Sequence, residues 1–589
     1  MTKNTIIAII LSTIVVFASL FIQTKLFPNS TQYTDTSKTE QTAASDVQNE
    51  ENAGHEEFNG EKSSIIVAEE SEKEITEEET TVVSTQKAEI ILTNRGGDII
   101  SYKLKEHIDT DTKDGIQMVD NVSALNRACA VAFGDVDSKI SNDLFALTKE
   151  NDNTYLFTKT YSIKNEDGSV NKFVFGKRYT FDSESYMFKL EILFHSLEGD
   201  IANLGYTLRT SPQIGPHFNP KLNRYENRQF ISFNGSKAKR QVISAKQFKM
   251  YNKEYIWNGI AGKYFVELVV PENTEKMDFT YYSTLVEVND YSNAQAILVR
   301  KPINENDVND SYFMYFGPRD EKNLKIFNNA EKNSWAVGGL KLNECMNSNG
   351  WLGWLETVLK WIMEVIYKFV HNWGISIIIM TILIKLLMFP FTRKQSMSTL
   401  KMQEIQPKMQ ALQAKYKDNP AKLQEEMGKL YKSADYNPMS GCLPMLVQFL
   451  ILFAMYNLFN NYFEFRGSVF IPHWIEDLSS GDSVHTLGFN IPFFGNQVRI
   501  LPFIYLVSQL LFGKITGNGG TAAAGSTQAQ MQMMMYGMPI MFFVLFYNAP
   551  SGLLLYWTIS NIFQMGQQII INNTMKKKRA EMALKNKTK

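Results

Sequence analysis

The chain contains the stretch Gly374-Ile-Ser-Ile-Ile-Ile-Met-Thr-Ile-Leu-Ile-Lys385-Leu-Leu-Met-Phe-Pro390, in which one lysine interrupts an otherwise apolar run. A helix of this length crosses most of a bilayer, because each residue rises about 1.5 Å. A charge in hydrocarbon costs roughly 2.5 to 3.5 kcal/mol on insertion scales, so such a lysine normally faces a polar cavity, a partner charge or a substrate path. Lys385 is therefore the first candidate functional residue. The alternative is snorkelling, in which the lysine stem carries the ammonium toward the nearby end of the helix.

Other apolar segments predict further membrane-spanning helices. Five segments lie in the C-terminal half, at residues 374–391, 441–462, 499–513, 535–549 and 551–571. A further apolar run, Ile6–Ile22, is typical of either a cleaved signal peptide or an uncleaved anchor, and its length favours an anchor over residues 1–26. We therefore predict a polytopic α-helical membrane protein with six transmembrane helices, five of them in a core over residues 374–575.

The charges of the chain predict its orientation in the membrane. Residues 393–438, expected to form a helical hairpin broken at Asp418-Asn-Pro420, carry nine Lys/Arg and five Asp/Glu. The tail, residues 576–589, carries seven basic residues and one acidic residue. By the positive-inside rule both segments lie in the cytoplasm. Six spans then put both termini in the cytoplasm and the large region after the first span outside.

The region between the first two spans has two parts. Residues 27–85 are rich in Ser, Thr, Gln, Asn and Glu, with 15 acidic and 3 basic residues between Pro28 and Thr85. This composition predicts a disordered acidic linker. Residues 86–345 instead contain short alternating runs such as Ala88–Thr93 and Tyr186–Phe194, separated by turn residues. They predict a large antiparallel β-sandwich outside the cell membrane.

A third pattern lies directly before the spanning core. Residues 346–373 contain Glu356, Lys360, Glu364 and Lys368 at steps of four, beside several tryptophans. The spacing predicts an amphipathic helix at the membrane interface, supported by Glu356/Lys360 and Glu364/Lys368 pairs. A core helix of a soluble domain would show the same period, but the adjoining span favours the interface.

Four segments carry a resemblance to a known family. They are Asn372-Trp-Gly-Ile-Ser-Ile-Ile-Ile-Met-Thr381, Gln406-Pro-Lys408, Asn437-Pro-Met-Ser-Gly-Cys-Leu-Pro-Met-Leu-Val-Gln448 and Pro550-Ser-Gly-Leu-Leu-Leu-Tyr-Trp-Thr-Ile-Ser-Asn561. Weaker matches are Asn94-Arg-Gly-Gly-Asp98 and Tyr315-Phe-Gly-Pro318. The chain thereby resembles the YidC/Oxa/Alb membrane-protein insertases, in the form found in Gram-negative bacteria. The resemblance covers nearly everything except the linker.

The resemblance implies a function and a set of site residues. It implies an inner-membrane insertase and chaperone with a periplasmic β-sandwich and a five-helix groove open to cytoplasm and lipid. Lys385 stands where the family usually carries arginine, which keeps the charge and loses the forked donor geometry. Thr381, Gln448, Tyr556 and Trp557 match polar or aromatic groove positions. The implied partners are nascent membrane proteins and lipids, with the Sec translocon and the ribosome; the basic tail fits either ribosomal RNA or anionic lipid.

Other classes of function find less support in the sequence. A secondary transporter or channel is the alternative, but such proteins usually show internal repeats and paired intramembrane charges. We find no nucleophile with a base, no metal-ligand spacing and no phosphate-binding loop in the sequence, so we predict no enzyme, no cofactor, no metal and no small-molecule substrate. The sequence does not decide whether Cys129 and Cys345 form a disulfide.

Overall fold

A computed structural model describes residues 65–587, with gaps at 69–74, 110–111, 165–168, 200, 202–203, 217–225, 244–247, 252–254, 284–286, 289–290, 293, 304, 347–351, 417–418, 435, 437–438, 492–493 and 518–535. The chain divides into two compact units, Met1–Met346 and Asn347–Lys589. The division falls one residue after the end of the β-sandwich predicted from the sequence. The predicted anchor, residues 1–26, and most of the predicted linker lie outside the described residues.

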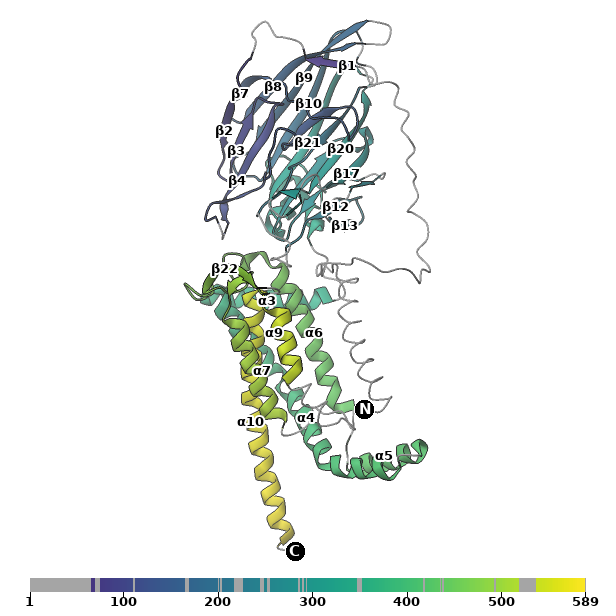
Figure 1. Ribbon diagram of the computed structural model, residues 1–589, viewed down its shortest axis with the longest axis vertical. Helices are drawn as coiled ribbons and strands as arrows, with labels where there is room; N and C mark the ends of the chain where they lie inside the picture. Colours follow the sequence, from purple (N-terminus) through teal and green to yellow (C-terminus); the bar gives the residue numbers. More distant parts are fainter. Residues whose placement is uncertain are drawn as a thin grey trace. The chain divides into compact units, whose positions relative to one another are not determined.

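The first unit is built from antiparallel strands (Figure 1). The largest sheet has ten strands. In spatial order they are β1 (Ile65–Ala68), β8 (Thr154–Lys164), β9 (Val170–Phe181), β10 (Met187–Glu198), β21 (Asp307–Pro318), β16 (Phe265–Pro271), β15 (Trp257–Ala261), β12 (Gln229–Phe233) and β13 (Ala238–Val242), with β7 (Ala146–Asn151) beside β8. Every described pairing between these strands is antiparallel, as the alternating sequence predicts.

Two smaller sheets complete this unit, with a short hairpin of β18 (Glu287–Val288) and β19 (Tyr291–Ser292). One has the order β14 (Phe248–Tyr251), β17 (Met277–Ser283), β20 (Gln295–Ile303), β11 (Leu204–Arg209) and β6 (Ala130–Phe133). The other contains β2 (Thr80–Ser84), β3 (Ala88–Thr93), β4 (Asp98–Ile108) and β5 (Gly115–Gln117). A short helix, α2 (Glu321–Lys325), follows the last strand.

Aromatic side chains join the three sheets into a sandwich. On β10, Phe194 lies 5.6 Å from Tyr206 of β11, and Phe188 lies 5.9 Å from Tyr102 of β4, measured between ring centroids. Phe188 and Phe194 are six residues apart on one strand, so they point to the same face of the large sheet. Both smaller sheets therefore cover one face of the large sheet, and the buried aromatic core lies between them.

The predicted linker is wrong at its C-terminal end. Strands β1 and β2 lie within residues 27–85, and β1 pairs with β8 while β2 pairs with β3. The acidic composition of the segment conceals two short runs, Ile65-Ile-Val-Ala68 and Thr80-Thr-Val-Val-Ser84. These β-branched residues favour strands once a partner strand is available, which average composition does not reveal.

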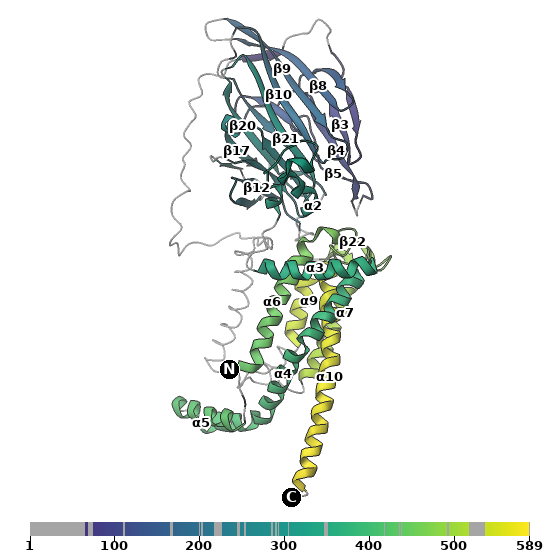
Figure 2. The same cartoon turned by 180° about the vertical axis from the view of Figure 1, so that it is seen from behind.

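The second unit is mainly helical (Figures 1 and 2). Its helices are α3 (Gly353–Val370), α4 (Trp373–Lys415), α5 (Pro420–Ser433), α6 (Met439–Asn461), α7 (Leu501–Gly517), α9 (Met538–Phe546) and α10 (Ser551–Lys587), with a hairpin of β22 (His485–Ile491) and β23 (Gly495–Val498). Within the described ranges, Trp373–Gln395 is the helical stretch long and apolar enough to cross a membrane, and Leu501–Ile515 is a shorter apolar helix. The count of six spans therefore stays a prediction.

The boundary between the second predicted span and the cytoplasmic hairpin differs from expectation. Helix α4 continues without a break from Trp373 to Lys415, through Pro390 and Pro407. The span and the first arm of the hairpin, predicted over 393–438, are thus one helix. The second arm, α5, begins where the sequence indicates. Asn419 caps it by accepting from the Lys422 amide at 3.1 Å, and Pro420 occupies its first turn.

Helix α3 is amphipathic as predicted, but its side chains pair differently. Glu356 is buried and accepts from Asn457 of α6 at 3.0 Å, and Glu364 accepts from Tyr462 at 2.9 Å. Lys360 lies 3.8 Å from Glu364, so the predicted Glu356/Lys360 pair is replaced by Lys360/Glu364. The carboxylates thus attach α3 to α6 and to Tyr462, the residue directly after α6, and burial raises the pKa of Glu356 to about 7. Trp354 and Trp361 point outward, with about two thirds of each exposed.

Candidate functional site: a polar interior in the helical unit

Helix α10 is the common neighbour of the other long helices. Its Tyr556 ring lies 5.9 Å from Phe459 of α6, and its Trp557 ring lies 5.6 Å from Tyr505 of α7 and 4.7 Å from Phe546 of α9. Consecutive residues on a helix point about 100° apart, which explains why this aromatic pair contacts different neighbours. Tyr556 and Trp557, both predicted site residues, therefore lie inside the bundle and not on its outer surface.

Lys385 is buried on α4, with only 5% of its surface exposed. Thr381 lies one turn earlier on the same face and is also buried, its hydroxyl donating to the Ile377 carbonyl at 2.6 Å. The Gln567 amide of α10 donates to the Lys385 carbonyl at 3.3 Å, so this part of α4 faces α10. No salt bridge to Lys385 is found in the part of the chain that the structure describes. Lys385 is therefore enclosed by protein in the helical unit.

Gln448, the fourth matched position, lies on α6 with an exposed side chain. Its carbonyl oxygen accepts from the Gln564 amide of α10 at 3.2 Å. Gln448 is thus connected to α10 from one side, and Lys385 is connected to α10 from another through Gln567. Among the described residues, no hydrogen bond joins the Lys385 ammonium directly to Thr381, Gln448, Tyr556 or Trp557.

Several polar residues that the sequence analysis did not single out lie in the same interior. Asn561 of α10 donates to Ser508 of α7 at 3.1 Å, and both side chains are buried. Gln567, Thr558 and Ser560 of α10 are buried as well. Uncompensated polar side chains are costly in a membrane span and usually face the bundle interior. Polar residues within the predicted span 551–571 could therefore have been predicted to face the interior. Ser508 could have been predicted in the same way from the span 499–513.

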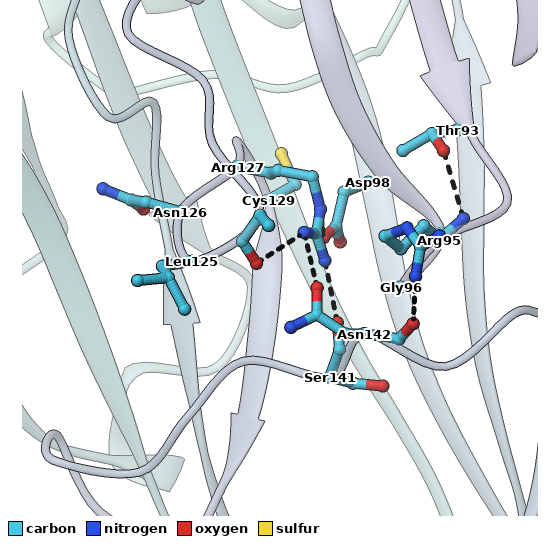
Figure 3. A network of polar contacts seen from close by, with 12 residues as sticks. Thr93, Arg95, Gly96, Asp98, Leu125, Asn126, Arg127, Cys129, Ser141 and Asn142 are labelled. Atoms are coloured by element: carbon cyan, nitrogen blue, oxygen red, sulfur yellow. Dashed lines mark hydrogen bonds and ion pairs between the residues drawn. The ribbon is translucent and has the colours of Figure 1, made fainter. Parts of the chain in front are cut away.

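The first unit contains a separate network of buried charges (Figure 3). Asp98 accepts from Arg127 at 2.7 Å and from Lys177, and all three side chains are almost fully buried. The remaining donors are satisfied: Lys177 also donates to the carbonyls of Gly96 and Cys129, and Arg127 to Asn142 and Ser141. This completeness indicates a structural role rather than a binding site.

The two glycines of the Asn94-Arg-Gly-Gly-Asp98 segment allow the backbone to turn beside this network. Gly96 and Gly97 have φ of +70° and +61°, which side-chain-bearing residues rarely adopt. A Cβ on Gly96 would lie 2.6 Å from the Asp98 carboxylate, and one on Gly97 would lie 2.8 Å from Phe157. The segment therefore positions Asp98 in the core.

Two further questions from the sequence concern cysteines and metals. Cys129 and Cys345 are free and buried, so the disulfide left open by the sequence is not formed. Burial raises the pKa of the Cys345 thiol to about 11. Among the described residues, no group of three or more His, Cys, Asp or Glu side chains is arranged to hold a metal ion.

Comparisons with known proteins agree with this two-part organisation. The family described as YidC periplasmic domain matches residues 80–362, and the family described as 60Kd inner membrane protein matches residues 365–578. Membrane protein insertase YidC of Treponema denticola is 42% identical over 589 residues, covering 98% of this chain and 100% of that protein. Its namesake in Treponema pallidum is 36% identical over 629 residues, with the same coverage. A solved active YidC insertase with its first transmembrane domain is 18% identical, covering 85% of this chain and 94% of that chain, with a TM-score of 0.32.

These matches define an inner membrane protein with a periplasmic domain. With a relative 42% identical over the full length, the chain belongs to the YidC family of membrane protein insertases. The family is one of insertases, and the comparisons give no support to the transporter or channel alternative.

Proposed function

We propose that this protein inserts and helps fold inner-membrane proteins through a hydrophilic groove in its helical unit. The observation that carries the proposal is the buried Lys385, which lies beside α10 with its polar residues Asn561, Gln564 and Gln567. Thr381, Gln448, Tyr556 and Trp557 supply the other polar or amphipathic walls. The named relatives are membrane protein insertases, which supports the same function here.

The physical basis is the cost of moving a hydrophilic chain segment through hydrocarbon. Each unsatisfied backbone group costs several kcal/mol in lipid, and each charged side chain adds a further cost. A groove with a cation and hydrogen-bonding walls lowers this cost for an acidic or polar flank. Once the flank has crossed, the apolar segment of the client is more stable in lipid and leaves sideways. No covalent bond is made or broken.

The finer organisation is part of the proposal. We infer six spans, including an anchor over residues 1–26, a core over 374–575, and cytoplasmic N- and C-termini, the last with its basic tail at 576–589. The clients are nascent membrane proteins, taken from the cytoplasmic side near the hairpin. The Sec translocon and the ribosome are the expected partners, and the Gram-negative form of the family is the expected subtype. The charge distribution and the motif resemblance support these assignments.

The test replaces Lys385 in cells depleted of the native protein. Lys385→Arg keeps the charge and should retain insertion, whereas Lys385→Ala and Lys385→Glu should impair it. Two unit charges 4 Å apart interact by about 4 kcal/mol at an effective dielectric constant near 20. A change of about 1.4 kcal/mol in the activation free energy changes a rate tenfold. We therefore expect Lys385→Glu to slow insertion of clients with acidic periplasmic flanks by at least roughly tenfold.

The measurement is pulse-labelled insertion together with growth complementation at matched expression. Lys394→Glu is the matched control, because Lys394 lies on the same helix with an exposed side chain and should have a small effect. Clients without acidic flanks provide the second comparison. If Lys385→Glu inserted acidic-flanked clients as fast as the unsubstituted protein, the groove mechanism as assigned here would be wrong.

A further inference from the structure

The hairpin of β22 and β23 lies between α6 and α7 and has an unusual composition. Residues 483–498 contain no Asp, Glu, Lys or Arg, although Asp482 and Arg499 flank them directly. The segment includes Val484, Leu487, Phe489 and Ile491. A two-stranded hairpin is marginally stable at best in water, and exposed strands are usually protected by charged residues. This hairpin has no such protection.

The hairpin is attached to the helical unit at its turn, through Phe494, and at its base, through the residues around Arg499. The Phe494 ring lies 4.7 Å from the Tyr547 ring, at the end of α9. The Tyr547 hydroxyl donates to the Gln497 carbonyl at 3.1 Å and accepts from the Arg499 amide at 3.2 Å. Asp482 accepts from the amides of Ile500 and Leu501 at 2.8 and 2.9 Å, which caps the start of α7. The position of the hairpin relative to α7 and α9 is therefore fixed.

Strand β22 is exposed along most of its length. Phe489 has 66% of its surface exposed and Ile491 has 39%, and the register between the strands is irregular between Thr486 and Ile491. Apolar side chains this exposed, on a well-anchored element, mark a surface that something covers.

The structure also indicates what covers them. An exposed apolar stripe begins at Ile500, directly before α7, and continues along α7 with Phe503, Ile504, Val507 and Leu511. Their spacing of three and four residues puts them on one helix face. The proposed function puts this face in lipid. Helix α3, with its outward tryptophans, crosses the bundle at the same end as the hairpin (Figure 2).

We propose that the β22–β23 hairpin is a lipid-binding element, embedded through Phe489 and Ile491 in the interface of the periplasmic leaflet. The proposal rests on the membrane topology inferred under the proposed function. The hairpin lies at the level of the lipid headgroups and not deeper, because the outer edges of a two-stranded sheet keep unpaired backbone groups that hydrocarbon cannot satisfy. It fixes the periplasmic end of α7 relative to the bilayer, in the way that interfacial aromatic residues anchor spanning helices.

The experiment measures the accessibility of nitroxide labels in the full-length protein, reconstituted at one copy per lipid nanodisc. Cys442→Ser provides the background, since Cys129 and Cys345 are buried. The test variant is Phe489→Cys, and Ile491→Cys is an independent second site if the first does not fold. Leu511→Cys on the α7 stripe is the lipid reference, and Glu272→Cys, an exposed position of the first unit, is the water reference. Each label is tested against oxygen, which concentrates in lipid, and a water-soluble nickel chelate.

We expect the label at Phe489 to collide with the nickel chelate several-fold less often than the label at Glu272, and to have an oxygen-to-nickel ratio between the two references. If Phe489 behaves like Glu272 while Leu511 is in lipid, the hairpin proposal is overturned and the proposed function is unaffected. Protection from both reagents would indicate a protein partner and would also overturn it. If Leu511 itself is in water, the inferred topology fails, and the hairpin proposal fails with it.

Discussion

Glu267 makes the stability of the first unit depend on pH in a defined direction. It lies on β16, fully buried, and accepts from the Thr210 hydroxyl at 2.6 Å and from the Ser211 amide at 2.9 Å. No salt bridge to Glu267 is found among the residues that the structure describes. Burial without a cation disfavours the carboxylate and raises the pKa of Glu267 from 4.5 to about 8. The substitution that tests this is Glu267→Gln.

The sign follows from the protons bound in each state. Between pH values of 4.5 and about 8, the folded protein keeps the proton on Glu267 and the unfolded chain has lost it. Because the folded state binds more protons, its free energy of unfolding falls as the pH rises, by about 1.4 kcal/mol per pH unit. The contribution is fully present below the unfolded pKa and is lost as the pH rises toward the folded pKa. From about pH 5 to about pH 7 the loss is on the order of 3 kcal/mol.

Hydrogen exchange of the full-length protein in nanodiscs measures this loss. The slowest amides of β16 and β21 report opening of the sheet, and their protection should fall about 100-fold over those two pH units, after correction for intrinsic exchange. In Glu267→Gln this component should disappear. The glutamine amide cannot titrate, and the Thr210 hydroxyl can turn to accept from it. The exposed Glu272→Gln is the control and should keep the full pH dependence.

The comparison of the two variants separates Glu267 from every other titrating group, since those groups contribute equally to both. An identical pH dependence in Glu267→Gln and the unsubstituted protein would refute the reasoning. It would mean that Glu267 has the same charge in the folded and unfolded states.

Three further predictions concern stability, topology and the role of the first unit. Asp98→Asn leaves Arg127 and Lys177 buried beside a neutral group, so it should lower the free energy of unfolding by about 3 to 5 kcal/mol, measured by thermal unfolding. The control is Asp114→Asn, at an exposed pair with Lys103, which should change the melting temperature little. A cysteine at Asn419 should react with a membrane-impermeant reagent only after the cells are permeabilised; reaction in intact cells would contradict the cytoplasmic hairpin. Deletion of most of residues 86–340 should leave insertion largely intact, because the sequence of this region shows no catalytic or cofactor motif and its described residues include no group arranged to hold a metal ion. Loss of insertion by a stable, correctly located deletion variant would contradict this.

Local sequence patterns were sufficient to predict much of the fold. The alternation in Tyr186–Phe194 predicts a half-buried strand, and in β10 the residues Phe188 to Phe194 alternate between buried and partly exposed positions as expected. Asn419-Pro420 predicts a helix start, because asparagine caps and proline fits the first turn. In both places the deciding interactions are between residues near one another in the chain.

The errors arise where distant residues decide the structure. Strand β1 exists because β8, almost a hundred residues later, pairs with it, and this pairing outweighs an acidic neighbourhood. Glu356 pairs with Asn457 of another helix instead of with Lys360 one turn away. Helix α4 continues through Pro390, although proline removes a hydrogen bond from a helix interior and normally marks a break. Helical periodicity and local pairing rules describe neighbours within one segment, so they do not predict contacts between distant residues.

The candidate site shows the same division. The sequence identifies Lys385, because a single charged residue in an apolar helix can be recognised from that segment alone. Gln567 and Asn561 acquire their significance from contacts with α4 and α7, so their role in the interior depends on how three helices pack. Their polar character alone is compatible with several environments.

The environment of Lys385 also bears on the presence of a lysine at a position where the family resemblance implies an arginine. Arginine is favoured where a planar fork meets a resident carboxylate. Here the Gln567 amide donates to the backbone carbonyl of Lys385, and no salt bridge to the Lys385 ammonium is found among the described residues. An ammonium without a fixed anion is unfavourable in a dry interior. Under the proposed function, water satisfies it at rest, and the acidic flank of a client replaces that water during insertion. Because the ammonium has no permanent partner in the described part of the chain, it is costly to bury, but it is also free to attract the acidic flank of a client. A resident aspartate or glutamate beside Lys385 would abolish that attraction.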